Sequence, residues 1–171
     1  MKIQLNDVDL DYIFGTLNIK NVTFGGNATG NLLATHLLTG APRLSTEQFD
    51  VKDFSYNEAI FGDLHLFSMW DNDNQGILMK GFIENKEDKQ TYIDGYIFPT
   101  KDSLSLSFDP DKLNIAFLRP FVSTVMSDIS GTASGHINFF GRFKALNVTG
   151  DAYVENLDFG IEYLNLSLIH I

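Results

Sequence analysis

The sequence predicts a mainly β fold, an antiparallel meandering sheet with one short helix. Apolar and polar residues alternate along most of the chain, as in Leu104–Phe108, which is typical of a strand with one buried face. One segment near 110–130 instead has the spacing of an amphipathic helix. Turn-forming stretches separate the alternating runs. They are Gly25–Asn27, Gly40–Pro42, Asp71–Gly76, Glu84–Lys89 and Pro99–Asp102.

The expected strands follow one another along the chain. The alternation changes parity after Val8–Phe14 and again at Val22. Each change predicts a bulge or tight turn, because a one-residue slip moves every side chain to the other face. No Gly/Ser-rich linker or long charge run marks a domain boundary, so one continuous β unit is expected. The later strand-like runs are 49–56, 64–70, 77–83, 93–97, 104–108, 137–143, 148–154 and 157–163.

The helix is expected to be an insertion between Asp109 and Gly131. Asp109 suits the N-cap, Pro110 suits the first helical position, and Gly131 lies just beyond the other end. Pro120 lies inside the segment and predicts a kink or two short pieces. We expect this helix to cover an open side or end of the sheet. Contact with a membrane or a partner is the alternative.

The composition excludes several functions. The 171 residues are 44% hydrophobic and carry a net charge of -10, so a folded chain is expected and nucleic acid is not an expected partner. The chain has no cysteine, which excludes disulfides, Cys-ligated zinc and a thiol nucleophile. No run of about 18 apolar residues and no signal-peptide core is present. If the protein acts outside the cytoplasm, this sequence is expected to be part of a longer one.

No catalytic or metal-binding pattern is evident. His36, His65 and His136 lack the spacing of metal ligands. The DNDN stretch at Asp71–Asn74 lacks the closing carboxylate of a calcium loop and predicts a solvated hairpin tip. No pair of glycosidase carboxylates and no G-x-S-x-G element is singled out. We therefore expect no enzymatic activity, no cofactor and no metal site.

Glycines recur in the C-terminal part, where the sequence reads SGTASGHINFFGRFKALNVTGDAYVENLDF. They fall where strands are expected to begin, end or bend. The units GHINFFG and GDAYVENLDFG are alike, as in a strand ladder that can be extended repeatedly. The block from Ile115 to Tyr163 resembles the TamB (translocation and assembly module) family of AsmA-like proteins, and the upstream GDLHLFSMWDNDNQGILMKGFI also fits it. Family members often have a proline where this chain has Lys144-Ala145-Leu146.

The resemblance implies a sheet curled into an open groove, a β-taco, with an apolar concave face and a polar convex face. It implies a non-enzymatic protein of the periplasm and cell envelope of diderm bacteria, anchored in the inner membrane by an N-terminal helix that this sequence lacks. The implied roles are outer-membrane protein assembly and phospholipid transport. The implied partners are phospholipid acyl chains and an outer-membrane assembly-type β-barrel.

We expect the groove to be lined by the apolar residues that occupy alternate positions in the clearest strands. Each of these residues could equally be an ordinary core residue. They are Phe82, Phe98, Leu104, Leu106, Phe108, Ile137, Phe139, Phe143, Val154, Leu157, Phe159 and Ile161. Two other functions fit the alternation. One is a fragment of an outer-membrane β-barrel. The other is a secreted β-rich adhesin or glycan-binding module, which would expose aromatic residues on a convex, polar face.

Residues 1–165 are expected to form a single groove segment of a longer protein. The last residues, LSLIHI at 166–171, resemble the in-frame translation of a common sequencing adapter. We expect them to be a non-native tail that should be excluded from reasoning about the fold. A natural apolar final strand is the alternative.

Overall fold

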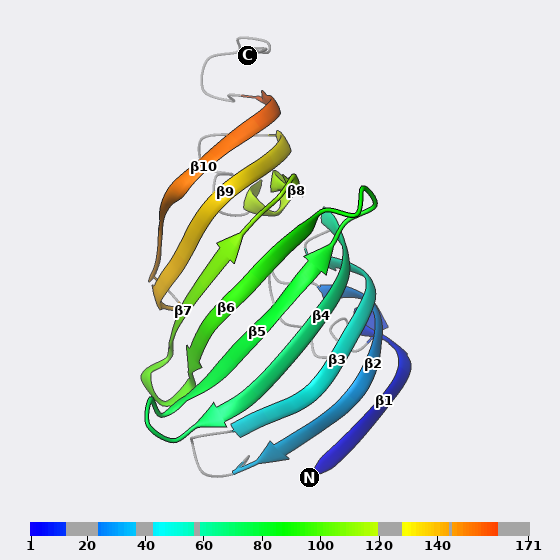
Figure 1. Ribbon diagram of the computed structural model, residues 1–171, viewed down its shortest axis with the longest axis vertical. Coiled ribbons are helices and arrows are strands. Elements are labelled where there is room, and N and C mark those ends of the chain that lie inside the picture. Colours follow the sequence, from blue (N-terminus) through cyan, green and yellow to red (C-terminus); the bar gives the residue numbers. More distant parts are fainter. Residues whose placement is uncertain (13–23, 37–42, 57–58, 120–127, 144, 161–171) are drawn as a thin grey trace.

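The computed structural model describes residues 1–12, 24–36, 43–56, 59–119, 128–143 and 145–160. These residues form one ten-stranded antiparallel sheet, as the alternation predicts (Figure 1). The strands are β1 (Lys2–Asp9), β2 (Phe24–Thr35), β3 (Arg43–Tyr56), β4 (Ala59–Asp71), β5 (Gly76–Glu84), β6 (Gln90–Phe98), β7 (Ser103–Asp109), β8 (Leu113–Asn114), β9 (Ile129–Arg142) and β10 (Ala145–Phe159). Their order in the sheet is β1-β2-β3-β4-β5-β6-β7-β9-β10, and β8 pairs with β9 beside this path.

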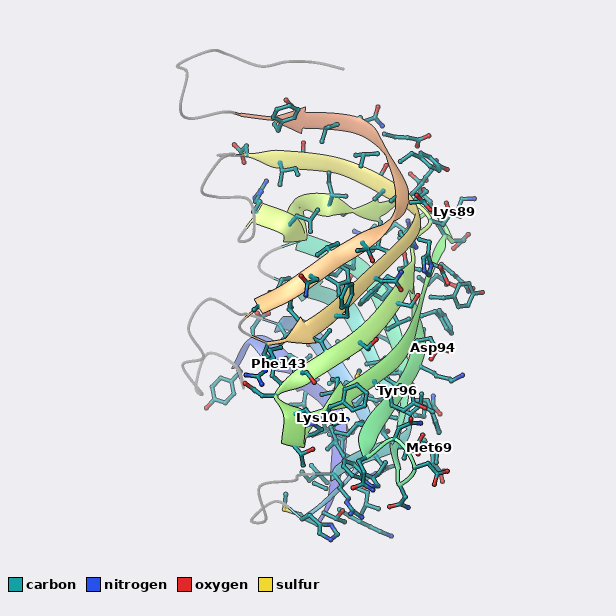
Figure 2. All side chains as sticks on the ribbon, turned by 90° about the vertical axis from the view of Figure 1, so that its left-hand side faces the viewer. Met69, Lys89, Asp94, Tyr96, Lys101 and Phe143 are labelled. Carbon is teal, nitrogen blue, oxygen red and sulfur yellow. The ribbon has the colours of Figure 1, made fainter. Side chains whose placement is uncertain are left out.

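The sheet is curled into an open groove. Seen from the side in Figure 2, the long strands bend, and Met69, Asp94 and Tyr96 point away from the hollow of the bend. The outermost strands β1 and β10 do not pair with each other within the described ranges. One face of the sheet is therefore concave and the other convex, as expected.

Gly135 and Gly150 lie inside the paired strands β9 and β10. Gly135 pairs with Ala152, and Gly150 pairs with Ile137. The φ angle of Gly135 is +133°, and a Cβ atom there would lie 2.3 Å from the backbone oxygen of Asp151. Because only glycine tolerates this angle and this approach, β9 departs from a regular strand at this point.

Three of the expected turns are present. Asp71–Gly76 connects β4 to β5, and Glu84–Lys89 connects β5 to β6. Pro99–Asp102 connects β6 to β7 and contains the 3₁₀ turn η1 (Pro99–Lys101). The Gly40–Pro42 turn lies outside the described residues.

The expected turn at Gly25–Asn27 is wrong, because these residues belong to β2. The pairing of β2 with β3 shifts register between Gly25 and Asn27, so the glycines form an irregularity within the strand. The strand continues because the next residue, Ala28, is fully buried in the core. A similar register shift between Leu5 and Val8 interrupts the pairing of β1 with β2.

The described helical turn begins later than the expected helix. Asp109 is the last residue of β7, and Leu113–Asn114 form β8. The only helical turn described near 110–130 is the 3₁₀ turn η2 (Ile115–Leu118), whose N-cap Asn114 accepts a hydrogen bond from the backbone N–H of Ala116 at 2.9 Å.

Burial of Leu113 explains the later start. Its side chain is 7% exposed and joins the core, and the residue pairs with Ala133 of β9. Gly131, expected just after a helix, belongs to β9. Pro120 lies outside the described residues. The turn η2 packs against β9 and β4 and so lies at one end of the sheet.

Candidate functional site

The pairing register assigns each side chain to one face, because directly paired residues of an antiparallel sheet lie on the same side. Leu106 of β7 pairs with Gly95 of β6 and with Phe139 of β9, and Phe139 pairs with Val148 of β10. We call the side of the sheet that carries Leu106 the inner face. From β4 to β10 its apolar residues include Leu64, Leu66, Trp70, Ile77, Met79, Ile83, Ile93, Ile97, Leu104, Leu106, Phe108, Ile137, Phe139, Leu146, Val148 and Val154.

The opposite, outer face carries polar and charged side chains together with several aromatic ones. Ser103, Ser105 and Ser107 of β7 alternate with inner-face residues. On β5 and β6, Lys80 and Asp94 are paired and form an ion pair at 3.2 Å. Figure 2 shows Asp94 on the side away from the hollow, so the outer face is the convex face and the inner face is the concave one.

One end of the inner face is closed by the protein's own core. Leu10, which follows β1, and Leu113 of β8 are 8% and 7% exposed and pack into the same cluster as residues of the central strands. The cluster consists of Leu10, Ala28, Val51, Ala59, Phe61, Leu64, Ile83, Ile93 and Leu113. This end of the concave face is therefore filled largely by the protein's own side chains.

The inner face is more open along β7, β9 and β10. Leu104, Leu106 and Phe139 are only half-buried. On β10, Val148 is 58% exposed and Val154 is 42% exposed. An apolar surface that extends over several strands and remains partly exposed is a candidate interaction surface.

The structure brings six of the twelve expected groove residues together on the inner face along the continuous register. The residues that share the inner face are Leu104, Leu106, Phe108, Ile137, Phe139 and Val154. Leu157 packs against the small cluster of Ile115, Ile129 and Ala133, and Phe159 pairs with Ile129. Phe143 lies in the turn after β9 and is 45% exposed. Ile161 lies outside the described residues.

Phe82 and Phe98 do not belong to this set and lie on the outer face. Phe82 pairs with Tyr92, and Phe98 pairs with Ser103. In both cases an apolar neighbour, Ile83 or Ile97, takes the inner position. Where apolar residues occupy both parities, alternation alone does not indicate which one faces inward.

Sequence reasoning missed several inner-face residues of β4 to β6. Trp70, Ile77 and Ile97 form one row across these strands, and Met79 lies in the next row. The signal that could have found them is hairpin pairing. Once the Asp71–Gly76 turn is placed, Trp70 must oppose Ile77.

The hairpin tip at Asp71–Gly76 is held by its own hydrogen bonds. The Asp71 carboxylate accepts bonds from Asn74 Nδ2 at 2.8 Å, from the backbone N–H of Asp73 at 2.8 Å and from the Tyr96 hydroxyl at 3.0 Å. These bonds, with that of the Asn74 side chain the largest contribution, lower the pKa of Asp71 to about 2. The hydrogen bond that the Tyr96 hydroxyl donates to Asp71 raises the pKa of Tyr96.

Two recesses lie outside the expected groove set. One of about 360 Å³ lies between β4, the β5–β6 turn, β8 and β10, and its lining includes Phe61, Lys86 and Lys112. The other, of about 1160 Å³, lies along β1 to β4 and includes Ile3, Thr46 and Met69 in its lining. Both linings mix polar with apolar residues, so neither recess is a closed apolar cavity.

The described part of the chain shows no cluster of three or more histidine or acidic side chains arranged to hold a metal ion. Over the same ranges, no helix has the length and apolar character needed to cross a membrane. Comparisons with known proteins found no match, since no family model, no curated protein and no solved structure matches this chain.

Proposed function

We propose that this chain is a non-enzymatic segment of a TamB-like cell-envelope protein whose inner face takes up phospholipid acyl chains. In this proposal the parent protein spans the periplasm and works with an outer-membrane β-barrel partner in protein assembly and lipid transport. The observation that carries the proposal is the contrast between the two faces. The inner face is mainly apolar from β4 to β10, whereas the outer face mixes serines and ion pairs with aromatic side chains.

Partial exposure of the inner face favours a ligand over a sealed core. Closely packed cores leave few side chains of this kind accessible, yet Leu104, Leu106 and Phe139 are half-buried. An acyl chain of about 16 carbons would gain roughly 10 kcal/mol gross on full burial, at ~0.8 kcal/mol per CH₂. Because apolar burial has no direction, such a surface would accept many chains, which suits a conduit.

Native mass spectrometry after incubation with phospholipid vesicles tests the proposal. The protein is expected to retain phospholipid. A charge on the inner face, Phe139→Asp, should strongly reduce the bound fraction. The matched control is Phe140→Asp, because Phe140 is the next residue, lies on the outer face and is already 39% exposed. Circular dichroism checks that each variant is folded.

A wild-type protein that holds no phospholipid would overturn the proposal. So would equal losses in the folded Phe139→Asp and Phe140→Asp proteins, because the inner face would then have no special part in binding.

A second candidate, glycan binding, is favoured by one observation on the outer face. Aromatic side chains are exposed there, with Tyr92 at 53%, Tyr153 at 62% and Phe67 at 36%. Exposed rings on a polar convex face are what a glycan-binding module would need. Binding to a glycan array that is lost in Tyr92→Ala, together with no retention of phospholipid, would favour this candidate over the first.

A further inference from the structure

Arg43, the first residue of β3, has no charged partner among the described residues. Its Nε atom is buried without a hydrogen-bond partner, and its guanidinium takes part in no ion pair with the described side chains. The chain has a net charge of -10, so carboxylates are abundant and an unpaired arginine is unexpected. A buried donor without a partner has an energetic cost and calls for an explanation.

Within the described ranges, Arg43 lies over the ring of Trp70. The guanidinium carbon lies 4.5 Å from the centroid of the Trp70 ring, within the range of a cation–π interaction. The indole N–H of Trp70 donates to Asn72 Oδ1 at 3.1 Å. The ring thus has a polar edge at the hairpin tip and a cation over its face.

Trp70 also begins a row of the inner face. It pairs with Ile77, Ile77 pairs with Ile97, and Ile97 pairs with Leu104. Side chains paired in this way lie on one side of the sheet. A cation without a charged partner among the described residues therefore lies beside the Trp70 end of an apolar row in which Ile77 is buried and Ile97 and Leu104 are half-buried. An amphiphile with an anionic head and an apolar tail matches this arrangement.

We propose that Arg43 binds the phosphate or carboxylate head group of an amphiphile whose chain lies along the row from Trp70 to Leu104. This inference rests on the proposed function and adds to it the orientation of the bound amphiphile in the groove. The planar guanidinium donates two parallel hydrogen bonds to such oxyanions, whereas burial of the tail has no preferred orientation. The head group is thus held at the β4–β5 hairpin end of the groove.

The fluorescence of Trp70 tests whether an anionic head group binds at Arg43, because Trp70 is the only tryptophan in the chain. The probes are dodecyl phosphate, dodecanol and inorganic phosphate, each titrated into the protein below any micelle concentration. We expect dodecyl phosphate to bind about 10- to 100-fold more tightly than dodecanol, which is the contribution of a charge-assisted hydrogen bond. Inorganic phosphate should bind far more weakly, since it has no tail.

Arg43→Gln should remove the preference for dodecyl phosphate and leave dodecanol binding unchanged. The matched control is Lys101→Gln, which removes the same charge from a cation that lies 4.9 Å from the centroid of the Phe98 ring. Lys101→Gln should keep the preference. Native mass spectrometry with the same probes provides a second readout that does not depend on the environment of Trp70.

The outcomes separate the two proposals. If the wild-type protein binds both amphiphiles equally, or if Arg43→Gln keeps the preference, the head-group site is overturned and the groove stands. If inorganic phosphate binds as tightly as dodecyl phosphate, Arg43 is a site for free anions and the inference is again overturned. If neither amphiphile binds, the proposed function fails and the inference fails with it.

Discussion

The rings of Phe108 and Phe139 meet edge to face across β7 and β9, with centroids 5.3 Å apart and planes at 84°. Both residues lie on the inner face, and both are half-buried. Their contact links strands that are separated in the chain by β8 and η2. It therefore joins β7 to β9 on the inner face and forms part of the surface proposed to bind acyl chains.

Replacing Phe139 with alanine should destabilise the protein by about 1–3 kcal/mol, because the variant loses a half-buried ring and an edge-to-face pair. Urea denaturation monitored by circular dichroism measures the change. The control is Phe140→Ala on the outer face, expected within about 0.5 kcal/mol of wild type. Equal effects would show that the inner face has no greater part in packing than the outer face.

Leu113→Ala should cost about 2–4 kcal/mol, because a nearly buried leucine is removed from the core. The residue is 7% exposed and comes from β8, so the loss would show that this strand closes one end of the inner face. Leu44→Ala is the comparison, since Leu44 is 40% exposed. A smaller effect for Leu113 than for Leu44, measured as free energies of unfolding in urea, would contradict the packing described here.

Gly135→Ala should destabilise the protein by more than about 1 kcal/mol, because alanine is strained at a positive φ. The new Cβ would also lie 2.3 Å from the Asp151 oxygen, a backbone atom that cannot rotate away. Thr149→Ser on the outer face of β10 is the comparison, and this variant should lower the stability by less. Thermal unfolding of both variants measures the difference, and an unchanged midpoint for Gly135→Ala would rule out the strain.

The Asp71 carboxyl should titrate with a pKa of about 2, well below its ordinary value of 3.8. Asn74→Ala should raise this pKa most, and Tyr96→Phe should raise it by less, since the Asn74 side chain makes the larger contribution. Tyr92→Phe is the control, because the Tyr92 hydroxyl donates to Gln90 instead. A carboxyl resonance followed by NMR between pH 1.5 and 6 measures each value.

The sign of the pH effect follows from this lowered pKa. A carboxyl that is more acidic in the folded state stabilises it above the unfolded pKa, and this stabilisation is lost as the pH falls through the folded pKa. The stability of the β4–β5 hairpin should therefore decrease between about pH 4 and pH 2. An Asp71→Asn protein with the same pH dependence as wild type over this window would contradict the assignment.

Alternation predicted which side chains share a face only where one parity is purely polar. In β7, Ser103, Ser105 and Ser107 leave no doubt that Leu104, Leu106 and Phe108 share a face. Local turn residues likewise indicated the hairpins at Asp71–Gly76 and Glu84–Lys89.

Other features depend on contacts between residues distant in the chain. The spacing of apolar residues predicts that Leu113 lies in a helix, but pairing with Ala133 and burial in the core place it in a strand. The contact between Arg43 and Trp70 joins two strands and has no local signal. The assignments of Phe82 and Phe98 needed the register of their neighbours, because adjacent apolar residues satisfy either parity.

Photo-cross-linking at two adjacent positions of β7 tests the central claim most directly. A benzophenone amino acid replaces Leu106 on the inner face in one protein and Ser105 on the outer face in another, and both are irradiated with phospholipid vesicles. The account predicts a lipid adduct at position 106 and none at position 105. Equal labelling at both positions, or labelling at 105 alone, would contradict it.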